Sequence, residues 1–139
     1  MNTRTFLVAC SLAGSVLLGG CDAHDTSLEA KSAYDQGKGT KHVYDATYDQ
    51  AWNAAHAAIN WNQVGAVTEH PDQHYFLTDP THFDQIGVWV AEETPGKTRV
   101  TVVVIDDPNL PGPNEEGVQK DIATALGLIQ AGKPVDKRP

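Results

Sequence analysis

Histidines and aspartates crowd into residues 70–84, and both residue types bind metal ions in proteins. Imidazole and carboxylate groups together suit zinc, nickel or copper. The spacing of His70 and His74 would put both rings on one face of a helix, but Pro71 argues against a helix there. In a hairpin, the two rings could instead face each other across the turn. The members of this group are His70, Asp72, His74, Asp79, His82 and Asp84.

Two interpretations of this group stay open at the level of sequence. The first is a divalent-metal site with His70, His74 and His82 as ligands. The second is the polar rim of a hairpin followed by a solvated loop. We favour the second interpretation, because no motif fixes the geometry of the ligands. We therefore expect no metal and no other cofactor.

Hydrolytic chemistry lacks its usual parts in this chain. A nucleophile needs an adjacent base and a group that orients the base, and no G-x-S-x-G elbow is present. His56 falls at the edge of an expected helix, which favours a packed or half-exposed surface position. Adjacent acidic residues on a strand point to opposite faces, and those at a helix start act as caps. These pairs are Glu92 and Glu93, Asp106 and Asp107, and Glu115 and Glu116. We predict that the protein is not an enzyme.

The N-terminus has the layout of a secretory signal. Arg4 precedes residues 6–18, thirteen residues without a charge. A membrane-spanning helix needs about 20 apolar residues, so this stretch is too short to span a bilayer. Residues 18–21 read Leu-Gly-Gly-Cys and resemble the lipobox of bacterial lipoproteins.

The lipobox resemblance implies that residues 1–20 are a signal peptide and that Cys21 receives a lipid. Cys10 would leave with the signal, so the mature domain would hold no thiol for a disulfide. Asp22 resembles the signal that retains lipoproteins in the inner membrane of enteric bacteria. We therefore expect a lipid-anchored protein of the bacterial envelope that faces the periplasm, with the inner membrane favoured. The alternative is a soluble secreted protein in which Cys21 is incidental.

Polar and small residues dominate both ends of the mature chain. Residues 21–40 are predicted to be the lipidated N-terminus and a flexible tether, of which nineteen residues would reach roughly 25 Å. A helical turn over residues 28–34 is the alternative. Residues 131–139 contain one glycine and two prolines and are predicted to be a disordered tail.

Residues 41–130 are predicted to form one α+β domain. Alternation and turn signals predict strands at 41–46, 64–70, 74–79, 85–93 and 97–106. Apolar stripes and N-caps at Thr47 and Asn114 predict helices at 48–60 and 115–130. The order β-α-β-β-β-β-α predicts a two-layer sandwich, an antiparallel sheet with both helices on one face. The length of the turn at Pro95 and Gly96 leaves open whether Val88 shares a face with Val103 or with its neighbours Val102 and Val104.

The first helix carries a further resemblance. With the lipobox, the tether and the strand meander, its pattern A-x-Y-D-Q-A-W-N-A-A-x-x-A-I resembles small bacterial lipoproteins of unknown function. The order of elements is similar to helix-grip modules in an accessory lipoprotein of the outer-membrane barrel-assembly machine. This resemblance implies no catalytic residues. The matching positions are Ala46, Tyr48, Asp49, Gln50, Ala51, Trp52, Asn53, Ala54, Ala55, Ala58 and Ile59.

The net charge narrows the class of partner. Ten basic residues stand against 18 acidic ones, a formal charge of −8, which disfavours nucleic acid. We expect a non-catalytic protein-interaction or envelope-accessory module, and a metal-binding lipoprotein is the alternative. The expected partner is an unknown envelope protein, bound by the sheet face near Trp89 or a groove beside Trp61. Burial of either tryptophan in the core is the competing interpretation.

Overall fold

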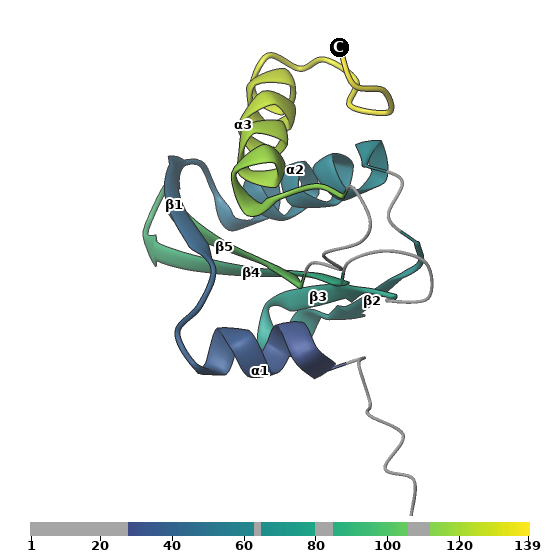
Figure 1. The fold of residues 1–139 in the computed structure, drawn as a ribbon. Coiled ribbons are helices and arrows are strands. Elements are labelled where there is room, and N and C mark those ends of the chain that lie inside the picture. Colours follow the sequence, from purple (N-terminus) through teal and green to yellow (C-terminus); the bar gives the residue numbers. More distant parts are fainter. Residues whose placement is uncertain (1–27, 63–64, 80–84, 106–111) are drawn as a thin grey trace, which may run out of the picture.

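The computed structural model describes residues 28–62, 65–79, 85–105 and 112–139, so the expected signal, Cys21 and His82 lie outside the described residues. The described elements follow one another along the chain as coloured in Figure 1. They are α1 (Glu29–Asp35), β1 (Thr40–Asp45), α2 (Tyr48–Trp61), β2 (Val67–His70), a 3-10 turn (Pro71–Gln73), β3 (Tyr75–Thr78), β4 (Gln85–Thr94), β5 (Lys97–Ile105) and α3 (Glu115–Gln130).

The strands form one antiparallel sheet in the order β1-β5-β4-β3-β2. Helices α2 and α3 cover one face of this sheet, and α1 lies against the opposite face (Figure 1). The predicted α+β architecture, with two helices on one face of an antiparallel sheet, is confirmed. The structure adds a third layer, because α1 covers the face that the prediction left open.

Small side chains let α2 approach the sheet closely. The helix begins with a capping box in which the Gln50 amide donates to Thr47 Oγ1 and the Thr47 amide donates to Gln50 Oε1. Its buried residues are alanines apart from Ile59. In α3, Val118, Ile122, Ala125 and Leu126 are buried in the same core. The two helices therefore share one apolar core with the sheet.

A β-bulge decides the register that the sequence left open. Val88 pairs with Val102, and the register shifts between Glu92 and Thr94. The extra residue at the bulge changes which side chains share a face. As a result, Val88 and Val102 both face α2 and α3, whereas Trp89 and Val103 face α1.

The expected tether is corrected by α1. Residues 29–35 form a helix, in which Ala30 and Ala33 are buried against the sheet. The apolar surface that this helix covers belongs to β3, β4 and β5, far along the chain. The composition of residues 21–40 shows too little apolar surface for this segment to fold by itself. It does not show the apolar surface of β3, β4 and β5 against which the helix packs.

The expected disordered tail is also corrected. The Trp61 indole N–H donates to the Val135 carbonyl at 2.9 Å. Arg138 forms an ion pair with Asp121, a buried carboxylate of α3 that also accepts a hydrogen bond from Asn62. The C-terminal segment therefore packs against α2 and α3, where its polar groups find partners.

The burial pattern of α3 predicts the effect of two matched substitutions. Ile122 is fully buried in the core, whereas Ile129 is only partly buried. Ile122→Ala should lower the free energy of unfolding by about 2–5 kcal/mol, as cavity-forming core substitutions do. Ile129→Ala should cost clearly less. Denaturant unfolding of both variants measures this, and equal losses would show that the buried face of α3 is misassigned.

Candidate functional site

Stacked rings cross the sheet face that α1 covers. Tyr34 of α1 lies flat on Trp89 of β4, with ring centroids 4.0 Å apart and an interplanar angle of 2°. Trp89 stacks on Tyr75 at 5.5 Å, and Tyr75 stacks on His70 at 4.5 Å. We call these four residues the ring ladder. It links α1 to the β2 edge of the sheet, so this face is held by aromatic contacts.

Two neighbours of Trp89 explain how a short helix docks here. A Cβ atom on Gly87 would lie 2.5 Å from two atoms of the Trp89 ring, so only glycine leaves room for the ring at this position. The Ala30 amide donates to Gln85 Oε1 at 2.8 Å in a buried hydrogen bond. This bond satisfies a helix N-terminal amide that would otherwise lack a partner. The dock of α1 therefore combines ring stacking with a specific polar contact.

A pocket lies beside the first turn of α1. Its volume is about 350 Å³. Leu28, at the rim, is 51% exposed, and Leu77 is buried in the sheet below. We call this cavity the Leu28 pocket. Its lining residues are Leu28, Ala66, Thr68, His70, Leu77, Thr78, Asp79 and Gln85. The mixture of apolar and hydrogen-bonding groups suits an apolar side chain with a polar surround.

Both tryptophans that the sequence analysis proposed for partner binding make contacts within the fold, and Trp61 remains partly exposed. Trp89 is only 7% exposed and lies beneath Tyr34. Trp61 packs against the core of the α2 and α3 face, and its indole N–H is bound to Val135. The expected exposed surface at Trp89 is therefore wrong, because α1 covers it. The sequence signal for this was the alternative helical turn over residues 28–34.

The candidate metal ligands separate onto opposite faces of the sheet. His70 stacks on Tyr75 in the ring ladder. His74 has a left-handed backbone (φ 58°), and its Nδ1 lies 3.2 Å from the Tyr48 hydroxyl of α2. The two rings therefore do not face each other across the hairpin, as a shared metal site would require. Within the described ranges, no three His, Cys, Asp or Glu side chains are arranged to hold a metal ion. The third candidate, His82, lies outside those ranges.

His56 lies on α2 in a half-buried position. Its Nε2 has no hydrogen-bond partner among the described residues and lies 3.6 Å from Glu69 Oε1. Its ring packs on Phe76, with centroids 4.2 Å apart. Burial lowers the pKa of His56, and the Glu69 charge opposes this shift. The ring is therefore neutral at pH 7 and packs as an aromatic group.

Comparisons with known proteins found no relative of this chain. No protein-family model, curated protein or solved structure matches it. In the part of the chain that the structure describes, no helix is both long enough and apolar enough to cross a membrane. The site therefore rests on its own geometry.

The ring ladder predicts that Tyr34 holds α1 in place. Tyr34→Ala removes a stacked pair, which contributes about 0.5–1.5 kcal/mol beyond its buried area. We expect a lower free energy of unfolding and a larger fraction of tryptophan emission quenched by acrylamide, because Trp89 loses its cover. Tyr34→Phe keeps the ring and should behave like the unaltered chain. Unchanged quenching in Tyr34→Ala would contradict the stacking role.

His56 predicts a pH dependence of stability. Its folded pKa lies below the unfolded value of about 6.5. The unfolded chain therefore binds more protons, and stability falls as pH drops below that value. His56→Gln removes this contribution, so its free energy of unfolding should decline less between pH 7.5 and pH 5.5. Parallel denaturant titrations at these two pH values measure the difference. An equal decline in both proteins would show that His56 does not contribute.

Proposed function

We propose that this chain is a membrane-anchored lipoprotein of the bacterial envelope that faces the periplasm and works as a non-catalytic protein-interaction module. The single observation that carries the proposal is the short distance along the chain between the expected lipid anchor and the folded domain. Cys21 and Leu28 are seven positions apart, and α1 begins at the next residue.

Chain geometry limits how far the domain can stand from its anchor. Seven residues span at most about 25 Å when fully extended. Helix α1 is docked on the sheet, so it belongs to the domain and adds nothing to the tether. The face that carries α1 and the Leu28 pocket therefore stays near the membrane. The C-terminal segment lies beyond the opposite face of the sheet (Figure 1).

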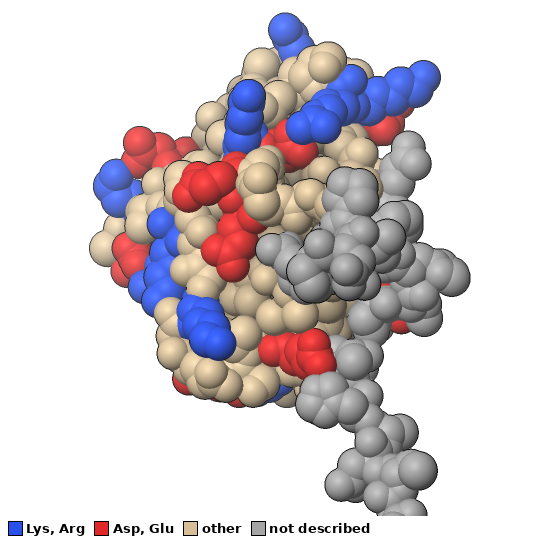
Figure 2. Space-filling model, in the orientation of Figure 1, with Lys and Arg blue, Asp and Glu red and all other residues tan. Residues whose placement is uncertain are grey.

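The distribution of charge favours a protein partner over the lipid surface. Acidic and basic side chains are mixed over the face shown in Figure 2. The whole chain carries a formal charge of −8, which repels anionic headgroups. Among the described residues, Leu28 and Val43 are the large hydrophobic side chains that remain exposed. Leu28 borders a pocket, so we assign partner contact to the Leu28 pocket, with an apolar side chain of the partner as its occupant.

Anchoring is tested through Cys21. The unaltered chain should give a mature N-terminus that starts at a lipid-modified Cys21 and sediments with membranes. Cys21→Ser should abolish acylation and processing at this position, because the thiol accepts the lipid. Mass spectrometry of the N-terminal peptide decides between these forms. An unmodified N-terminus that starts at another residue would contradict the proposal.

Partner contact is tested by site-specific photo-crosslinking in membranes. A photoreactive residue at position 28 should capture a discrete partner, and Cys21→Ser should abolish this capture. Position 120 in α3 is an exposed control on the opposite face of the sheet. Capture of the same products from both positions, or of none from position 28, would overturn the role of the Leu28 pocket.

A further inference from the structure

Strand β1 forms an edge of the sheet. It pairs with β5 on one side, and it ends the strand order on the other. Val43, at its centre, is 52% exposed. An edge strand offers unpaired backbone groups to another strand, and proteins usually protect such edges. The direction of the β1 backbone groups and the order of the β1 charges determine which strand can pair with this edge.

The direction of the backbone groups follows from bonds elsewhere in the sheet. The Val90 amide donates to the His74 carbonyl, so the backbone N–H and C=O groups of Val90 are directed toward β3. The backbone groups of its neighbour Trp89 are therefore directed toward β5. Backbone groups alternate along each antiparallel strand. Because Trp89 pairs with Thr101, the backbone groups of Thr101 are directed toward β4 and those of Val100 toward β1. Val100 pairs with His42, so the backbone groups of even-numbered β1 residues are directed toward β5. Lys41, Val43 and Asp45 therefore direct their N–H and C=O groups away from the sheet.

The charges of these outward residues match when a second β1 strand runs antiparallel to the first. In an antiparallel pair of two β1 strands centred on Val43, each Lys41 lies opposite Asp45 of the second copy. Each outward backbone group then also meets an outward group. The Asp45 carbonyl already accepts from Gln130 Nε2 at 2.8 Å, so it would accept the Lys41 amide of the second copy with its second lone pair. A register shifted by two residues would keep the backbone match but would lose both charge pairs.

We propose that the β1 edge binds a second copy of this chain, with a two-fold axis at Val43 and reciprocal pairs between Lys41 and Asp45. A lysine on an edge strand normally discourages pairing with another strand. In this register its charge meets an acidic residue. Asp45 is already bound to Lys97 at 2.6 Å, so the second copy's lysine completes a three-residue charge network.

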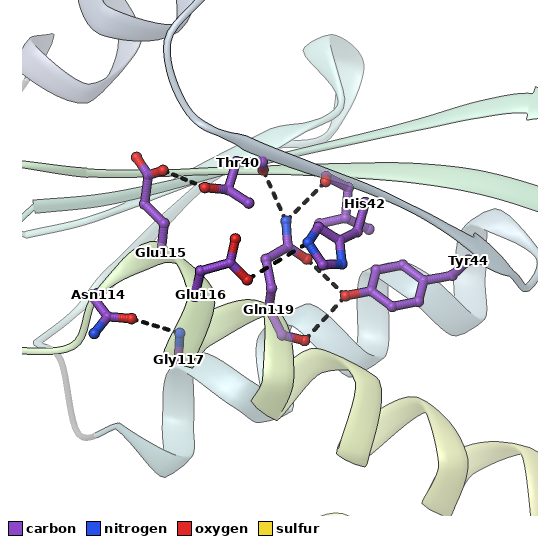
Figure 3. A network of polar contacts seen from close by, with 9 residues as sticks. Thr40, His42, Tyr44, Asn114, Glu115, Glu116, Gly117 and Gln119 are labelled. Atoms are coloured by element: carbon purple, nitrogen blue, oxygen red, sulfur yellow. Dashed lines mark hydrogen bonds and ion pairs between the residues drawn. The ribbon is translucent and has the colours of Figure 1, made fainter.

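Contacts with α3 hold the β1 edge in shape before any second copy arrives. Thr40 donates to Glu115 Oε2 at 2.6 Å, and Gln119 donates to the Thr40 carbonyl at 2.9 Å (Figure 3). The Tyr44 hydroxyl donates to Gln119 Oε1 at 2.7 Å, and burial raises the pKa of Tyr44 to about 12, so this donor persists at neutral pH. A preformed edge loses little conformational entropy on pairing.

The expected dimer is weak and leaves the Leu28 pocket free. Stable interfaces usually bury about 1,200–2,000 Å², and a single edge of six residues falls short of that. Confinement to a membrane surface would raise the local concentration and favour pairing. The Leu28 pocket is lined from β2 and β3, at the other edge of the sheet. Failure of the dimer would therefore leave the proposed partner contact untouched, and the reverse also holds.

Disulfide trapping tests the axis. In the full chain carrying Cys10→Ser and Cys21→Ser, Val43→Cys adds the only thiol. A hydrogen-bonded antiparallel pair has its Cα atoms about 5.5 Å apart, within the range that a disulfide bridges. Mild oxidation in detergent should give a covalent dimer. Leu28→Cys is the matched control, with nearly equal exposure, and should remain mostly monomeric. Equal trapping at both positions, or none at position 43, would overturn the proposal.

A charge swap tests the register. In the Val43→Cys background, Lys41→Asp or Asp45→Lys alone places like charges opposite each other and should reduce trapping at least about two-fold. The double variant restores opposite charges between the two copies and should trap more dimer than either single variant. Recovery should be partial, because a lysine at position 45 still lies beside Lys97. Melting temperatures verify that each variant is folded. Trapping that is unchanged by the single variants, or that is no higher in the double variant than in them, would overturn the register and with it the proposed interface.

Discussion

The two apolar faces of the central strands are the constraint on which the rest of this structure depends. Strands β4 and β5 direct buried side chains to both sides of the sheet, with Val88 and Val102 on one side and Trp89 and Val103 on the other. Two amphipathic helices cover only one of these faces. The other must be covered as well, and a seven-residue helix does so by laying Tyr34 flat on Trp89. The segment before the first strand is consequently part of the fold.

Local signals in the sequence were sufficient for most of the fold. The capping box at Thr47 and the stripes of both long helices predicted where the helices lie, and the order of elements predicted the sheet. Long-range pairing was not readable in the same way. Residues 29–35 look too polar to fold alone, because their apolar partner surface comes from three distant strands. The register of β4 on β5 depends on a bulge at residue 93, and no turn motif in the sequence predicts this bulge.

The candidate site in the structure differs from the predicted one because long-range packing also decides which residues are exposed. The local sequence around Trp89 predicts an exposed binding residue only if the N-terminal segment is a tether, and the covering helix α1 removes Trp89 from solvent. His70 and His74 looked like neighbours across a turn, but the left-handed backbone at His74 sends its ring to the opposite face. The surfaces left for contact are at the edges of the molecule. Among the described residues, we propose the Leu28 pocket near the β2 edge and the outer edge of β1 as these surfaces.

Hydrogen exchange at the Ala30 amide tests the central claim that α1 is an integral layer of the domain. This amide donates to Gln85 Oε1, a group 55 residues away, so its protection depends on the dock of α1. The account predicts that the Ala30 amide exchanges slowly, through the same opening that exposes amides of β4 and β5. Exchange at the rate of an unstructured peptide, while the β4 and β5 amides remain protected, would contradict the account.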